Sequence, residues 1–169
     1  MPLKLFDNLS DNSFLHNFRD MKSLFNPSYN QQIIDRINVL TPASKALWGK
    51  MHVAEMLAHS QAPLQVAFGE LKLKRGIIGM LFGKMAKRKM LADAEFKKNL
   101  PTAPSFLVKG NVNFEEERKK LISLVQKFYQ TGPKGLPLDE HPFFGKLTPE
   151  EWDQLQYKHL DHHLRQFGV

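Results

Sequence analysis

The 169-residue chain contains no cysteine, an absence that narrows the possible chemistry. It excludes a disulfide framework, a zinc site with thiolate ligands and a thiolate nucleophile carried by the protein itself. The sequence also lacks any apolar run near the roughly 20 residues that a membrane-spanning helix needs. Residues 1–14 have no apolar centre of signal-peptide length. We therefore expect a cytoplasmic protein without a transmembrane segment.

The net charge of +7 is confined to one part of the chain. The stretch from Lys72 to Lys98 holds nine basic residues against two acidic ones, so it carries the entire excess. The remainder of the chain is neutral. Because a nucleic-acid-binding fold usually spreads basic side chains over a surface of the fold, this distribution argues against nucleic acid as the partner.

The spacing of apolar residues predicts four long helices and no strand. The expected helices span residues 26–40, 52–69, 114–130 and 149–166, with a shorter helix near 77–88. Thr148, Pro149 and Glu151 form a capping-box pattern at the start of the last helix, and Gly132-Pro133 should end the third. We expect a single all-α domain over residues 1–169, a four-helix bundle. Residues 1–25 would form an N-terminal arm, and 70–113 a long basic crossover between the second and third helices.

Two histidines on the last helix share its inward face. His159 and His163 are four residues apart, or about one helical turn, and the apolar residues of this helix point to the same side. Lys158 and Asp161 fall on the face expected to contact water. A pair of inward histidines with this spacing can present two nitrogen atoms to one metal ion, although a buried polar pair without a metal would have the same pattern.

A third inward histidine lies on the second helix. His59 shares a face with Met56, Pro63 and Val66, whereas His52 lies at the helix start and is expected to cap it or face water. Three imidazoles leave a zinc-like ion with an open fourth position, as in catalytic sites. The sequence thus predicts a divalent-metal site formed by His59, His159 and His163.

Three segments together resemble the DinB/YfiT-like superfamily, and more narrowly an uncharacterised branch of DinB-like bacterial proteins. They are residues 47–51 (Leu-Trp-Gly-Lys-Met) followed by His59, residues 141–152 (His-Pro-Phe-Phe-Gly-Lys-Leu-Thr-Pro-Glu-Glu-Trp), and the His-x3-His pattern of His159 and His163. The resemblance implies an up-down-down-up bundle with a crossover and a three-histidine site for zinc or nickel. Some relatives are metal-dependent S-transferases that use small bacterial thiols such as bacillithiol or mycothiol, and homodimers are compatible with the family.

The predicted site supports more than one function. A metal ion that activates a low-molecular-weight thiol would give an S-transferase acting on a small electrophile, and one that activates water would give a hydrolase. Glu55 and His141 are candidates for groups that assist the ion, although Glu55 could equally be a surface carboxylate and His141 part of a structural loop. The basic crossover could instead make the protein a non-catalytic binding module. The histidines could also form a metal-free polar cluster.

Overall fold

The computed structural model describes residues 22–73, 76–92, 95–102, 104–108, 110–137 and 139–169. Over these residues the protein is all-helical and contains no β-strand. The α-helices are α2 (Pro27–Val39), α3 (Val53–Ala67), α4 (Ile77–Leu91), α5 (Phe114–Gly135) and α6 (Pro149–Gln166), and Pro104–Phe106 forms the short 3-10 helix η1. None of these helices is both long and apolar enough to cross a membrane.

The helix ends are set by local side-chain chemistry. Asn26 accepts hydrogen bonds from the backbone N–H groups of Ser28 and Tyr29 at the start of α2. The predicted capping box of α6 is confirmed, because Thr148 accepts from the Glu151 N–H and the Glu151 carboxylate accepts from the Thr148 N–H. These caps satisfy backbone donors that have no partner inside the helix.

The expected break at Gly132-Pro133 is present in α5, although the helix ends at Gly135 and not at residue 130. Gly132 has a φ of 62° and breaks the helical geometry, and a short turn to Gly135 follows the break. A residue with a side chain would be strained at this positive φ, so glycine allows the chain to change direction here.

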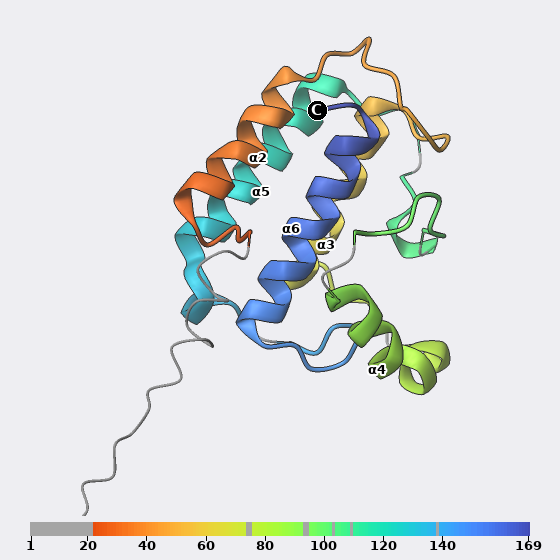
Figure 1. Ribbon diagram of the computed structural model, residues 1–169, viewed down its shortest axis with the longest axis vertical. Coiled ribbons are helices and arrows are strands. Elements are labelled where there is room, and N and C mark those ends of the chain that lie inside the picture. Colours follow the sequence, from red (N-terminus) through yellow and green to blue (C-terminus); the bar gives the residue numbers. More distant parts are fainter. Residues whose placement is uncertain (1–21, 74–75, 93–94, 103, 109, 138) are drawn as a thin grey trace, which may run out of the picture.

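Four helices form the core, and α4 lies apart from them (Figure 1). The helices α2 and α3 each pack against both α5 and α6, whereas α4 packs against α6. The largest fully buried side chains come from every one of the four core helices and from the segment before α2; they include Leu24, Ile33, Leu57, Phe128, Trp152 and Leu160. Burial of this apolar surface is the main force that holds the four helices together.

Buried polar groups fix how the elements are aligned. The Asn30 amide donates to the Leu24 and Val125 carbonyls, at 3.1 Å and 2.9 Å, and so joins α2 to α5. Asp153 of α6 accepts from the Leu24 N–H at 2.7 Å. The segment just before α2 is thereby attached to α6. Residues 1–21 of the expected N-terminal arm lie outside the described residues.

Two residues of α6 expected to face water bind other helices instead. Asp161 pairs with Arg36 of α2 at 2.7 Å. Lys158 donates to the Met90 carbonyl at 2.7 Å and also to that of Ala92, both at the C-terminal end of α4. The expectation was wrong because a helical wheel gives the direction of a side chain but not which distant segment lies in that direction.

Candidate metal centre

The helices α3 and α6 bring the three predicted histidines together. His59 comes from the middle of α3, and His159 and His163 lie one turn apart on α6. Nε2 of His59 lies 3.1 Å from Nε2 of His159. The His163 ring centroid lies 4.8 Å from that of His59 and 4.6 Å from that of His159. One nitrogen from each ring falls within 4.8 Å of the other two, so the three side chains are close enough to hold one metal ion.

The orientation of His59 is fixed by a backbone carbonyl. Its Nδ1 lies 3.0 Å from the oxygen of Phe106, in the short helix η1. Because a carbonyl oxygen only accepts, Nδ1 carries the proton and Nε2 keeps a lone pair directed at the other two rings. The same Nδ1–H to carbonyl contact orients metal-ligating histidines in many proteins.

His163 is oriented in the same way by a side-chain amide. Its Nδ1 lies 2.9 Å from Oε1 of Gln166, and Nε2 of the same glutamine donates to the Trp48 carbonyl at 2.8 Å. Since the Trp48 oxygen can only accept, the amide nitrogen of Gln166 must face it and the amide oxygen must face His163. Nδ1 of His163 is therefore the protonated nitrogen, and its Nε2 has the free lone pair.

Gly49 leaves the space in which the Gln166 amide lies. Its φ is +81°, and a Cβ atom at this position would lie 2.8 Å from Nε2 of Gln166. Glycine is therefore suited to this position both by its backbone conformation and by its lack of a side chain. The segment between α2 and α3 thus supports the amide that orients His163.

His159 completes the cluster but has an unpaired nitrogen. Its Nδ1 is buried and has no hydrogen-bond partner among the residues that the structure describes. With the protons of His59 and His163 directed away from the cluster, His159 is the only member that can place an N–H between the rings. The centre of the cluster is consequently rich in lone pairs, which is the environment that a cation requires.

Burial keeps the three imidazoles neutral. It lowers the pKa of His163 to about 4, with the nearby His59 adding to the effect, and lowers the pKa of His159 well below 6.5. The pKa of His59 is lowered by burial as well, although its bond to the Phe106 carbonyl opposes the shift. At neutral pH all three rings are therefore in the form that can donate a lone pair to a metal.

A pocket of about 500 Å³ lies beside the cluster, and His163 is one of its lining residues. Its walls come from the segment before α3, from α3 itself, from the crossover and from α6; they include Trp48, Lys50, Glu55, Asn99, Phe106 and His162. The size falls within the range of small-molecule sites. A ligand in this pocket would reach the cluster through His163.

Most of this chain matches a known family model. Residues 33–168 match the family described as "Protein of unknown function (DUF1569)". The chain belongs to the DUF1569 family. The matched region contains all three clustered histidines and Gln166, and it starts within α2. No curated protein and no solved structure matches the chain.

Of the two assisting candidates in this DUF1569 chain, Glu55 lies near the cluster. It lines the pocket, and its Oε2 accepts from the backbone N–H of His52 at 2.8 Å, which caps the start of α3. His52 is exposed at the N-cap, as expected. Glu55 therefore has a structural role, and its position in the pocket wall keeps it within reach of a bound molecule.

His141 lies away from the other histidines, in the loop before α6. It is buried, and its Nδ1 accepts from the N–H groups of Phe143 and Phe144, both at 3.1 Å. Its ring packs between Phe144 and Trp152, with centroid distances of 4.4 Å and 5.2 Å. These contacts hold the loop together, and His141 is not one of the three residues that converge.

Sequence reasoning identified the three clustered histidines but not the groups that orient them. Gln166 follows His163 by three residues, a spacing that places the two side chains on the same side of a helix and that could have indicated the contact. The contact with the Phe106 carbonyl could not be predicted in this way, because a backbone oxygen leaves no pattern of residue types in the sequence.

Proposed function

We propose that this DUF1569 protein binds one divalent transition-metal ion, zinc or nickel, through His59, His159 and His163. The convergence of the three neutral imidazoles is the observation that carries the proposal. Nitrogen ligands of a tetrahedral zinc ion, with bonds of about 2.0–2.1 Å, lie roughly 3.3 Å apart. The 3.1 Å between the Nε2 atoms of His59 and His159 is close to that separation.

The outer contacts of two histidines also support a ligand role. Metal-ligating histidines nearly always donate their second N–H to a carbonyl or a carboxylate, which fixes the ring and raises its basicity. His59 has this contact with Phe106, and His163 has it with the Gln166 amide oxygen. Both contacts leave Nε2 free to bind the ion.

We further propose that the bound ion serves catalysis on a small molecule, with thiol transfer to a small electrophile as the reaction and hydrolysis as its alternative. An ion held by the three neutral imidazoles would lower the pKa of a thiol or water bound to it. The pocket beside His163 supports this proposal because it gives a small molecule access to the cluster. Glu55, His162 and Lys50 are titratable side chains that line this pocket and could contact that molecule.

The proposal includes the DinB-like fold, an up-down-down-up four-helix bundle with a crossover. Its support is the pattern of connections. Residues 40–52 join α2 to α3 and residues 136–148 join α5 to α6, whereas the connection from α3 to α5 covers 68–113. A connection of the latter length can return along the whole bundle, so that α3 and α5 would run in the same direction.

Metal content tests the first step. Untagged protein is analysed by mass spectrometry, with His59→Ala and His163→Ala beside the wild type. We expect close to one ion per chain in the wild type and loss of the ion in both variants. His162→Ala is the matched control, because His162 adjoins His163 but is outside the cluster, and it should keep the ion. Wild-type protein that takes up no zinc, nickel or manganese when offered them would overturn the proposal.

The reaction is tested separately, on metal-loaded protein. A panel of small thiols is offered together with an electrophilic acceptor, and a panel of esters and amides is offered alone. Consumption of thiol that depends on His163 would support transfer, and His163-dependent cleavage without a thiol would support hydrolysis. If metal-loaded protein is inactive in both panels, the proposed catalysis is refuted and only metal binding remains.

A further inference from the structure

The helix α4 has two glycines against the protein and three large apolar side chains exposed to solvent. A Cβ atom at Gly83 would lie 2.1 Å from the Phe143 carbonyl oxygen, and one at Gly79 would lie 3.1 Å from the Phe143 Cα atom. The inner face of α4 is thus in direct contact with the backbone of the loop before α6. Glycine allows this close approach because it has no side chain.

The outward side of α4 carries three of the large apolar side chains that are exposed in this protein. Leu81 is 70% exposed, Met85 68% and Phe82 51%. Leu81 and Met85 are four residues apart and so form one stripe, with Phe82 next to it. Contiguous apolar side chains on the surface usually mark a contact site, whereas single ones need no explanation.

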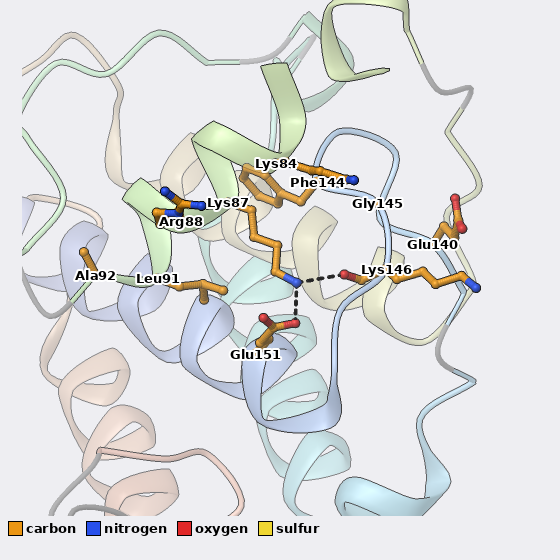
Figure 2. A pocket seen from close by; sticks show the side chains of 10 residues that line it. All are labelled: Lys84, Lys87, Arg88, Leu91, Ala92, Glu140, Phe144, Gly145, Lys146 and Glu151. Carbon is orange, nitrogen blue, oxygen red and sulfur yellow. Dashed lines mark hydrogen bonds and ion pairs between the residues drawn. The ribbon is translucent and has the colours of Figure 1, made fainter. Parts of the chain in front are cut away.

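Basic residues surround this apolar stripe. Lys84, Arg88 and Lys89 are exposed, and α4 contains no acidic residue. The fourth basic residue of the helix, Lys87, points inward instead, where it pairs with Glu151 at 2.7 Å and donates to the Lys146 carbonyl at 3.0 Å (Figure 2). The three exposed charges have no ion pair with the described residues and can contact an external partner, whereas Lys87 holds the helix in place.

The C-terminal end of α4 is also attached to the body. Lys158 donates to the Met90 carbonyl, and the Gln154 amide donates to the Leu91 carbonyl at 3.1 Å. Figure 1 shows the helix standing off the four core helices, next to the loop before α6. Its apolar and basic surface is therefore presented in a fixed orientation.

We infer that α4 docks on the surface of an anionic phospholipid membrane. Leu81, Phe82 and Met85 enter the boundary between headgroups and acyl chains, and Lys84, Arg88 and Lys89 contact the lipid phosphates. A helix with large apolar side chains bordered by lysine and arginine lies in the plane of such an interface. The apolar stripe favours a membrane over nucleic acid, since phosphate backbones are bound by basic side chains without apolar anchors.

A pocket beside the helix shares Lys84 and Arg88 with this surface and adds Lys146 to it. It measures about 870 Å³ and is lined by Lys84, Arg88 and Lys146 together with Glu140 and the Lys87–Glu151 pair (Figure 2). The pocket is bounded by α4, the loop before α6 and the first turn of α6. A lipid headgroup at the edge of α4 would lie at its entrance.

The test is co-sedimentation of the full-length chain with vesicles of phosphatidylcholine alone and with added phosphatidylglycerol. We expect binding to the anionic vesicles, weakened by salt because the charges are exposed. Lys84→Gln with Arg88→Gln should lower the affinity roughly 25-fold, at about fivefold for each removed charge. Leu81→Ser with Met85→Ser should lower it at least about tenfold, because less apolar surface is buried.

The matched controls change similar residues elsewhere. Val39→Ser removes an apolar side chain that is 65% exposed at the end of α2, and Lys119→Gln removes an exposed charge of α5; both should bind as the wild type does. Circular dichroism checks that each variant is folded. Absence of binding to anionic vesicles, equal binding to neutral ones, or an equal loss in the controls would overturn the inference.

Two further outcomes would assign the surface to another partner and also overturn it. Tighter binding to duplex DNA, unchanged by Leu81→Ser with Met85→Ser, would point to nucleic acid. A drop in molecular mass by analytical ultracentrifugation in that apolar variant would show that a second copy of the chain covers the stripe.

Discussion

Replacing Gln166 with methionine should weaken metal binding without removing a ligand. Methionine has a similar length and fills the same space, but it can neither accept from His163 Nδ1 nor donate to the Trp48 carbonyl, bonds of 2.9 Å and 2.8 Å in the protein. Loss of the group that orients a ligating histidine typically costs 10–100-fold in metal affinity, or about 1.4–2.7 kcal/mol. We expect a weakening within that range for Gln166→Met.

The metal-free protein should lose stability in the same variant. Gln166 is only 5% exposed, and its replacement leaves the His163 N–H and the Trp48 carbonyl without the partner that each has in the wild type. An unsatisfied buried group costs about 1–3 kcal/mol. Gln166→Glu should behave differently, because its carboxylate still accepts from His163. Its zinc affinity should lie nearer to that of the wild type.

The assay is a zinc titration in competition with a chromophoric chelator, alongside thermal unfolding of the metal-free protein. Gln154→Met is the matched control, because Gln154 is a glutamine of the same helix whose amide binds a carbonyl of α4 instead. It should keep wild-type zinc affinity. Wild-type affinity in Gln166→Met, or an equal loss in Gln154→Met, would refute the role assigned to this amide.

Two further predictions concern the same centre. Burial holds the pKa of His163 at about 4 and lowers those of His59 and His159. The native state therefore binds fewer protons than the unfolded state between about pH 4 and 6.5. The free energy of unfolding of the metal-free protein should fall as the pH drops through that window, by at most about 3.4 kcal/mol for His163 alone. Urea titrations above and below the window measure the change, and an equal stability on both sides would contradict it. Gly49→Ala should weaken zinc binding, because its Cβ would displace Gln166. It should also lower the free energy of unfolding by more than the roughly 1–2 kcal/mol that a side chain costs at positive φ. Gly110→Ala has a similar φ of +86° but open space around it, so it should show the backbone cost alone in thermal unfolding, with unchanged zinc affinity.

Features determined by neighbouring residues were predictable from the sequence. The capping box of Thr148 and Glu151 and the break at Gly132 depend on a few adjacent positions, and the structure has both. The convergence of His159 and His163 could be predicted because helical periodicity alone places them on one face. His59 was predicted as the third member of the cluster from the apolar pattern of the second helix and from the family resemblance.

Features determined by contacts between distant segments were not predictable in this way. Lys158 was expected to face water, yet it binds carbonyls of α4 that lie more than 60 residues earlier in the chain. Likewise, nothing in the sequence around Phe106 indicates that its carbonyl accepts from His59. Such partners depend on where the crossover lies against the helices, which neither propensity nor periodicity specifies.

The contact between His59 and Phe106 has a consequence for how the crossover and the proposed metal site would affect each other. Phe106 belongs to a segment that contributes no ligand, yet it both orients His59 and lines the pocket beside His163. Thermodynamic linkage requires that if metal binding stabilises this segment, stabilising the segment strengthens metal binding by the same factor. A molecule that fills the pocket and contacts Phe106 would thus change metal affinity without contacting the metal. Amide exchange of residues 105–108 would report on both events, because the protection of this segment should change when either the ion or the pocket ligand binds.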